Sequence, residues 1–414
     1  MTQKSPPAQT PRPRRGPLDG VRVLDLSRVL AGPFCSLILA DLGAEVIKVE
    51  ELGSGDQTRT IPPFVGGESH YFLSINRNKS SVALDARTEA GRDILRKLAT
   101  QCDVVLENFR PGVMERLGLG YAQLRELKPD IIVCSISGFG AKGAMSGKPS
   151  FDLVTQALSG VMSINGYPDG TPTKLGLPLG DVGGGLWAAL GVMAALNERH
   201  ATGEGSHVDL SLLEGLIGLL GYLAQIYLVT GESPGRMGNS HHNIVPYGLM
   251  PVKDGHIVLA LHVGEFWRKF CRAIGRDDLI MDARFRTVKD RHKNRVELER
   301  QITEIMLTKT VVEWQQILDD ADVPHGPVNN MEQALNQPIV RERGFVKEVQ
   351  HPTAGTVKVV GSPLRFEGKY EAGRLEAPPL LGEHTREVLG NLLGLSDAEI
   401  ERLIREKVIS VNKQ

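Results

Sequence analysis

The sequence predicts an α/β protein whose larger part is a parallel sheet covered by helices. Short apolar segments alternate with amphipathic helical segments through the first half of the chain. Such alternation is typical of a parallel sheet with helices on both faces. The chain of 414 residues is also long enough for two or more domains and a large buried core. Because open parallel sheets bind ligands at the carboxyl ends of their strands, we expect the functional residues there.

The expected elements of the first half follow in order. Residues 21–26 form a buried strand, and a helix begins near Pro33, a favourable first helical residue, and ends at Gly43. The other expected elements are strands at 45–50, 103–108 and 130–137 and an amphipathic helix at 88–101. Together they predict a sheet of at least four parallel strands.

The pattern changes after about residue 225. Residues 231–242 are typical of a loop, and a strand at 256–261 precedes amphipathic helices that extend to about Asp320. From about residue 340, short strands with prolines and glycines lead to a helical pair at 383–407. The predicted organisation is a disordered tail at 1–16, the amino-terminal part of a large domain at 17–225, a small domain at 226–335 and a return to the large domain at 336–414.

Charge and cysteine usage limit the function classes. Lys+Arg 48 against Asp+Glu 49 gives a net charge of −1, which argues against nucleic acid or anionic membrane as a partner. The four cysteines are far apart and form no CxxC, so we expect buried thiols in a cytoplasmic protein without disulfides or a metal site. No apolar run reaches membrane-spanning length, because the longest, around 210–229, is interrupted by Glu214 and several glycines.

The most informative segment is residues 175–205. Asp181 follows Pro178 and Gly180, and three glycines, Gly183 to Gly185, lead into an apolar helix. Unpaired N–H groups and the helix dipole favour a carboxylate at such a helix start, and glycines let a ligand approach the backbone closely. Two interpretations remain open from the residues alone: an ordinary N-cap aspartate, or a covalent nucleophile beside a ligand site.

A glycine pattern after the strand at 130–137 matches a nucleotide-binding motif by its letters. Gly138, Gly140 and Gly143 have the spacing of the dinucleotide fingerprint. Gly147 and Pro149 follow where the helix of that motif should run, and no acidic residue stands at the required distance. We therefore expect a ligand-facing loop, which disfavours a nucleotide-binding oxidoreductase.

Histidines and arginines supply further candidates. His241 and His242 have no neighbouring ligand spacing for a metal, so a polar substrate-facing loop is the better interpretation. Arg87, Arg110 and Arg116 stand near predicted strand ends, where guanidinium groups could bind a multiply phosphorylated ligand. The alternative for each arginine alone is an ordinary solvated surface.

Five segments in order resemble family III CoA-transferases: residues 20–50, 76–85, 107–121, 151–160 and 180–196. The resemblance runs from about residue 17 to PLLGEHT at 379–385 and beyond. It implies a Rossmann-like large domain with an inserted smaller α+β domain, and an interlocked homodimer. It also implies coenzyme A and acyl-CoA as substrates rather than a permanently bound cofactor, and it favours the nucleophile interpretation of Asp181.

The resemblance also assigns binding residues. The implied CoA contacts are Val29, Leu30, Ala31, Leu84, Asp85, Arg87, Asn108, Phe109, Arg110 and Arg116. Gly183 and Gly184 are expected to offer N–H groups to a developing oxyanion and to let the thiol of CoA reach Asp181. Candidates for binding the carboxylic acid substrate are Arg28, Asp152, His241, His242 and Tyr247. Glu51 stands where some relatives have a cationic phosphate ligand.

The resemblance narrows the reaction and leaves alternatives. Residues 239–261, 322–331 and 351–363 resemble transferases that move CoA from succinyl-CoA to a dicarboxylate such as glutarate. The implied route passes through a mixed anhydride and an aspartyl-CoA thioester at Asp181. The nearest alternative is a 2-methylacyl-CoA racemase, which places a histidine where this chain has Phe151; two-base epimerisation needs a proton-transfer group on each face of the carbon, and phenylalanine supplies none. A non-catalytic acyl-CoA binder is the remaining alternative.

Overall fold

The computed structural model describes residues 16–366 and 375–412, so the predicted tail lies, apart from Gly16, outside the described residues. The chain divides into two compact units. The large unit contains the described residues up to Ser159, the segment Gly176–Leu220 and the described residues from Glu342 onward. The small unit contains Gly160–Leu175 and Gly221–Arg341.

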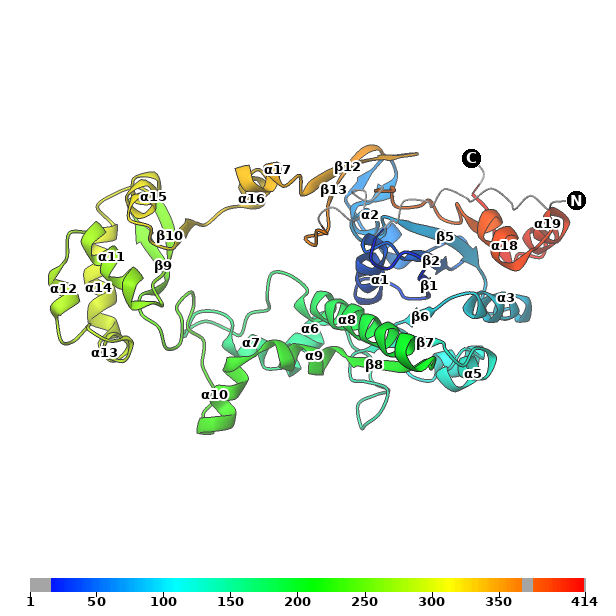
Figure 1. Ribbon diagram of the computed structural model, residues 1–414, viewed down its shortest axis with the longest axis horizontal. Helices are drawn as coiled ribbons and strands as arrows, with labels where there is room; N and C mark the ends of the chain where they lie inside the picture. The colour runs from blue at the N-terminus through cyan, green and yellow to red at the C-terminus, as the bar shows by residue number, and fades with distance from the viewer. Residues whose placement is uncertain (1–15, 367–374, 413–414) are drawn as a thin grey trace, which may run out of the picture. The chain divides into compact units, whose positions relative to one another are not determined.

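A seven-stranded sheet forms the centre of the large unit (Figure 1). Its strand order is β14-β5-β2-β1-β6-β7-β8, and only β14 is antiparallel to its neighbour. The strands are β1 (Arg22–Asp25), β2 (Glu45–Glu50), β5 (Lys79–Leu84), β6 (Val104–Glu107), β7 (Ile132–Ser137), β8 (His207–Ser211) and β14 (Ile409–Ser410). The predicted α/β class and parallel sheet are confirmed.

Helices cover both faces of this sheet because its central strands are apolar on both sides. Val23 of β1 packs in the core under α1 (Ala31–Asp41) and α8 (Leu179–Thr202). Leu24, its neighbour, faces the core on the opposite side. That second core is covered by α3 (Glu89–Thr100), α5 (Tyr121–Leu127), α18 (Thr385–Leu393) and α19 (Asp397–Arg405). Full burial of alternate apolar residues on both faces is what a parallel sheet requires.

The order of the strands reverses beside β1. From β1 the chain passes to β2 and β5 on one side, then returns to β6 on the other. The carboxyl ends of the adjacent strands β1 and β6 are therefore a topological switch point, where open α/β sheets bind ligands. The segment after β1 contains Arg28–Ala31, and the segment after β6 contains Asn108–Arg110.

Smaller elements complete the large unit. They are a 3-10 turn (Gln57–Thr60), β3 (Phe64–Val65), β4 (Glu68–Ser69), α2 (His70–Ile75), α4 (Val113–Leu117), α6 (Asp152–Leu158), α9 (Leu212–Leu219), β12 (Val346–His351) and β13 (Gly355–Val360). The loop at 138–150 contains no helix, so the glycine pattern there lacks the context of a dinucleotide site, as expected. All four cysteines are buried and unpaired, which confirms the prediction of buried thiols.

The small unit has its own antiparallel sheet and core. The sheet has the order β11-β10-β9, formed by β9 (Tyr247–Val252), β10 (Gly255–Ala260) and β11 (His325–Pro327). Trp267, Phe270, Phe285 and Trp314 are buried in its core. The helices are α7 (Val161–Ile164), α10 (Tyr222–Thr230), α11 (Gly264–Ala273), α12 (Asp278–Met281), α13 (Val288–Lys293), α14 (Arg295–Met306), α15 (Val311–Asp320), α16 (Met331–Leu335) and α17 (Pro338–Glu342), the last of which crosses the boundary between the units.

The sequence expectation about membrane-spanning length was wrong for one helix. By length and composition, α8 with 24 residues is apolar enough to cross a membrane, and 44% of its most apolar window is buried. The expectation failed because the glycines and Asp181 at the start of α8 interrupt the apolar pattern, so the full length of the helix could not be recognised from the sequence. In the large unit α8 packs against α1, α9, β7 and β8, as a core helix does.

Candidate active site

Asp181 is the third residue of α8 and lies in its first turn. The N-cap position belongs to Pro178, whose side chain makes no capping hydrogen bond. The interpretation of Asp181 as an N-cap aspartate was therefore wrong. Its carboxylate still lies at the positive end of a long helix, where the dipole favours the ionised form.

Asp152 supplies the cap that α8 lacks. Its Oδ1 accepts hydrogen bonds from the backbone N–H of Gly180 at 2.7 Å and of Asp181 at 3.4 Å. Its Oδ2 accepts from Nε2 of Gln156 at 2.7 Å. A Cβ on Gly180 would lie 2.9 Å from Asp152 Oδ1 and 2.7 Å from the hydroxyl of Thr155, so only glycine permits this approach. Asp152 therefore orients the backbone that carries Asp181.

The Asp181 carboxylate is left bare by this arrangement. Within residues 16–366 and 375–412, the carboxylate of Asp181 has no hydrogen-bond or ion-pair partner. Burial raises the pKa of Asp181 to about 7, and repulsion from Asp152 adds to the increase. A desolvated, unpaired carboxylate is a stronger nucleophile than a solvated one, and such shifts are typical of functional carboxylates.

An apolar cluster lies directly beside Asp181. Val182 packs with Val29, Leu30 and Tyr71 in this cluster. Burial raises the pKa of the Tyr71 hydroxyl, and the negative charge of Asp181 adds to the increase. Sequence reasoning did not identify Tyr71, because it lies in the short helix α2, far along the chain from Asp181. The sequence signal available for this helix was Ser69, its N-cap residue, which stands two positions before Tyr71.

The glycines that follow Asp181 serve helix packing. A Cβ on Gly184 would lie 2.3 Å from Leu212 Cδ2, and one on Gly185 would lie 2.8 Å from the carbonyl oxygen of Ala31. Hydrogen bonding within α8 begins before them, since Val182 N–H donates to Pro178 O at 2.9 Å. Their N–H groups are used inside the helix. This geometry does not support our expectation that Gly183 and Gly184 donate to an oxyanion.

The structure brings the segments after β1 and β6 together at the switch point. The N–H of Arg28 donates to Asn108 Oδ1 and the Asn108 amide donates to Arg28 O, both at 2.8 Å. The Arg28 guanidinium lies 5.1 Å from the centre of the Phe109 ring. Two groups of predicted CoA contacts, Val29–Ala31 and Asn108–Arg110, therefore form one surface.

The segment after β5 adds exposed charge to the same sheet edge. Leu84 is buried at the end of the strand, and Asp85 accepts two hydrogen bonds from the guanidinium and one from the backbone N–H of the exposed Arg87. Arg87 also lies 3.7 Å from Glu51, the residue that follows β2. Arg110 and Arg116 are exposed as well. The exposed position of these arginines is compatible with the predicted contacts to the phosphates of CoA. Those contacts remain a prediction.

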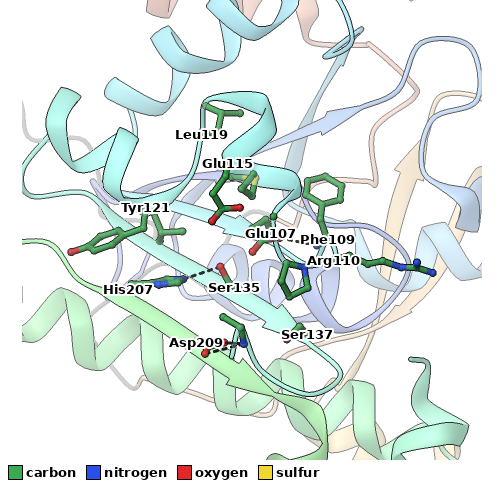
Figure 2. A pocket seen from close by; sticks show the side chains of 15 residues that line it. Glu107, Phe109, Arg110, Glu115, Leu119, Tyr121, Ser135, Ser137, His207 and Asp209 are labelled. Carbon is green, nitrogen blue, oxygen red and sulfur yellow. Dashed lines mark hydrogen bonds between the residues drawn. The ribbon is translucent and has the colours of Figure 1, made fainter. Parts of the chain in front are cut away.

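A cavity of about 130 Å³ lies beneath Phe109 and Arg110 (Figure 2). Glu107, Ser135 and His207 point into it, and His207 Nε2 lies 3.0 Å from the Ser135 hydroxyl. Burial raises the pKa of Glu107 to about 7. The cavity lies on the face of the sheet opposite α1 and α8, because Val133 of the same wall belongs to the opposite core. Its acidic lining is unsuitable for phosphate.

The remaining candidates belong to the small unit. His241 Nδ1 accepts from the N–H groups of Asn243 and Ile244 at 3.0 and 3.2 Å, so this ring nitrogen carries no proton. Burial lowers the pKa of His241, and His242 lowers it further. The His241 ring stacks on Tyr222 and meets Tyr247 edge-on. His242 and Tyr247 thus share one polar, aromatic segment with His241.

Comparison with known proteins identifies the family of the chain. The family described as CoA-transferase family III matches residues 18–385. The chain belongs to CoA-transferase family III. A succinyl-CoA:glutarate CoA-transferase from Homo sapiens is 40% identical over 394 residues, which cover 95% of this chain and 90% of that protein. A succinyl-CoA:mesaconate CoA-transferase from Haloarcula hispanica is 40% identical over 386 residues, with coverage of 90% and 96%.

A solved structure is similar over most of the chain. A CAIB/BAIF family protein from Brucella suis has a TM-score of 0.81 at 36% identity and covers 91% of this chain and 100% of its own. The protein is therefore an enzyme, a CoA-transferase of family III whose substrates are CoA thioesters. The family predicted from the five sequence segments is confirmed.

Proposed function

We propose that this family III CoA-transferase moves CoA from succinyl-CoA to a small dicarboxylate, with Asp181 as the covalent nucleophile. The observation that carries the proposal is the buried, unpaired Asp181 carboxylate at the start of α8, with its backbone oriented by Asp152. The substrate class is supported by relatives at 40% identity that are named for succinyl-CoA with glutarate or mesaconate.

The reaction begins with attack of an Asp181 oxygen on the thioester carbonyl of the donor. The C–S bond breaks, CoA leaves as the thiolate, and a mixed anhydride joins Asp181 to the donor acyl group. The thiolate then attacks the aspartyl carbonyl, the C–O bond to the donor breaks, and the donor acid leaves. The product is an aspartyl-CoA thioester.

The second half returns the enzyme to its starting state. The acceptor carboxylate attacks the aspartyl carbonyl and expels the CoA thiolate, which gives a second anhydride. The thiolate then attacks the acceptor's carbonyl carbon and releases the Asp181 carboxylate. Each step exchanges acyl bonds of similar energy, so neither ATP nor a change of redox state is needed. One acceptor oxygen remains on Asp181 after each cycle.

The residues around Asp181 support this chemistry in three ways. The apolar cluster of Val29, Leu30, Tyr71 and Val182 excludes water from one side, which protects anhydrides from hydrolysis. The Asp152 cap fixes the backbone at Asp181. The raised pKa of Asp181 indicates a carboxylate that is poorly solvated and therefore reactive when ionised.

Substrate binding is proposed at two places. Exposed guanidinium groups near the ends of β5 and β6 suit the phosphates of CoA: Arg87, Arg110 and Arg116. Arg28, after β1, is proposed for a carboxylate of the acid substrate. His241, His242 and Tyr247, which belong to the small unit, are proposed from the sequence as further ligands of the carboxylic acid substrate. A desolvated second carboxylate needs such a partner, since an unpaired buried charge costs several kcal/mol.

A homodimer is part of the proposal. Helices α6, α8 and α9 contact one another and share an exposed apolar surface. The exposed residues on these helices are Leu153, Leu158, Leu186, Trp187, Leu190, Ile217 and Leu219. Large exposed apolar patches are typical of protein interfaces, and a second copy of this chain is the proposed partner. Light scattering of the wild type and of Leu186→Glu tests this, and a monomeric wild type would contradict it.

The decisive experiment measures transfer and the covalent intermediate together. Wild-type enzyme is incubated with succinyl-CoA and with succinate, glutarate and chain-matched monoacids, and new CoA thioesters are detected by mass spectrometry. Hydroxylamine added to enzyme and succinyl-CoA alone converts an aspartyl thioester to a hydroxamate, which peptide mass spectrometry locates. We expect the hydroxamate on Asp181, none in Asp181→Asn, and a higher kcat/KM for dicarboxylates than for monoacids.

Three results would contradict different parts of the proposal. Transfer by Asp181→Asn at a rate near that of the wild type would place the nucleophile elsewhere. A preference for monoacids, formate or oxalate would refute the dicarboxylate acceptor and leave the transferase intact. Deuterium exchange at C2 of a 2-methylacyl-CoA, at rates comparable to transfer, would instead favour the racemase. The structure offers no replacement for its second base at the position of Phe151, whose side chain is 71% exposed.

A further inference from the structure

The turn between β1 and α1 contains an unfavourable backbone conformation. Val29 has φ of 66°, in the left-handed region. This conformation is strained for a β-branched residue, so surrounding contacts must hold it. The turn lies at the topological switch point, and Val29 packs in the apolar cluster beside Asp181.

A buried ion pair holds both ends of this turn. Lys48 Nζ and Asp56 Oδ2 are 2.9 Å apart, and the side chain of each is 1% exposed. Lys48 donates to the carbonyl oxygen of Ser27 at 2.9 Å. Both carboxylate oxygens of Asp56 lie 3.3 Å from the N–H of Val29. The pair thus acts on the backbone immediately before Val29 and on Val29 itself.

The pair stays charged in its buried position. Burial alone would raise the pKa of Asp56, but the Lys48 ammonium holds it below its usual value. The pKa of Lys48 is likewise raised by Asp25 and Asp56 against the opposing effect of burial. Buried ion pairs generally add little stability compared with apolar residues of similar size. Control of local conformation is therefore the more economical explanation for this pair.

We propose that Lys48 and Asp56 are positioning residues that hold Val29 in the left-handed conformation and so fix the start of α1 for CoA binding. This inference depends on the proposed contact of Val29–Ala31 with CoA. The start of α1 has no side-chain cap, so the direction of its first N–H groups is set by the preceding turn. If Val29 returned to the right-handed region, the chain after it would be redirected.

A double-mutant cycle with glycine tests the inference. Glycine adopts positive φ without steric cost, whereas alanine does not. We expect Asp56→Asn to weaken CoA binding at least tenfold, about 1.4 kcal/mol, in the wild-type and Val29→Ala backgrounds, but less than about threefold in the Val29→Gly background. The apparent Tm should fall by a similar amount in all three backgrounds, because Lys48 loses its partner in each.

The readouts are the Kd of CoA from calorimetry and the Tm from thermal unfolding. The inference would be overturned if CoA affinity fell equally in the Val29→Gly and Val29→Ala backgrounds, or if it fell in proportion to the Tm. Either result would show that the Lys48–Asp56 pair acts only on the stability of the fold. If Asp56→Asn is not recovered folded, Asp56→Glu keeps the charge beside Lys48 and displaces the carboxylate from the Val29 N–H, and the same cycle is measured with it. CoA binding is measured without an acceptor, so a failure of dicarboxylate transfer would be distinguished from a failure here.

Discussion

Replacing the catalytic carboxylate should stabilise the protein in a pH-dependent way. The pKa of Asp181 is raised from 3.8 to about 7, chiefly by burial. An acid whose pKa is raised by folding binds its proton more tightly in the folded state. Below about pH 4 Asp181 is protonated in both states and does not lower the free energy of unfolding. From about pH 4 to about pH 7 its contribution lowers that free energy increasingly. Asp181→Asn keeps the shape and removes this contribution.

The expected size follows from the shift. A difference of about three pKa units corresponds to roughly 4 kcal/mol at pH 8, as an upper limit. Residual solvent contact of the partly exposed side chain reduces it, so we expect about 2 kcal/mol at pH 8. At pH 5 a little more than a third of this stabilisation is expected. The reason is that pH 5 lies about 1.2 units above the unfolded pKa of 3.8, whereas the whole pKa shift is roughly 3.2 units.

The assay is thermal unfolding of ligand-free protein at about pH 5 and pH 8, with the wild type and Asp181→Asn side by side. The variant should have the higher apparent Tm at pH 8, by a few degrees, and a smaller advantage at pH 5. Asp19→Asn removes an exposed carboxyl of the same unit and serves as the matched control. An advantage equal at both pH values, or a wild type more stable at pH 8, would refute the desolvation argument.

Three further predictions concern the same site. Because Asp181 must be ionised to attack, kcat/KM should rise with pH to an inflection near 7, and a flat profile from about pH 5 to pH 9 would contradict this. Asp152→Asn keeps an oxygen for the cap but removes the repelling charge, so the same inflection should move to lower pH; an unchanged inflection would show that Asp152 acts only through the backbone. Gly185→Ala should lower the free energy of unfolding by about 1–3 kcal/mol, because its Cβ would meet the Ala31 carbonyl at 2.8 Å. Gly147→Ala, which meets nothing within 4 Å, should have little effect in the same unfolding measurement.

The strands β1, β2, β6 and β7 were predicted from their adjacent apolar residues, although β1 and β2 also bury the charged residues Asp25, Lys48 and Glu50. The pattern of β5 is obscured because Lys79 and Ser81 are buried in it. Lys79 is tolerated there because it donates to Pro33 O and Asn76 Oδ1 and pairs with Asp25. Pro33 and Asp25 are distant from Lys79 in sequence, so no local period indicates them.

The same limit applies to the site. Asp181 could be identified because its signal is local, a carboxylate at the start of an apolar helix. The function of Asp152 could not, because it depends on a hydrogen bond to the backbone 28 residues further along the chain. The glycines were assigned to a ligand because a glycine run suggests an open backbone. The structure shows that they bring α8 close to α1 and α9 instead.

Two carboxylates compete for one helix start, and the outcome explains why Asp181 is reactive. An aspartate in the first turn of a helix commonly accepts hydrogen bonds from the free N–H groups there, which would lower its pKa. At the start of α8 the N–H groups of Gly180 and Asp181 donate instead to Asp152, which lies in α6. Asp181 keeps the field of the helix but loses the hydrogen bonds, and the charge of Asp152 raises its pKa further. The cap thus leaves the second carboxylate desolvated and unpaired, which is the state that nucleophilic attack on a thioester requires.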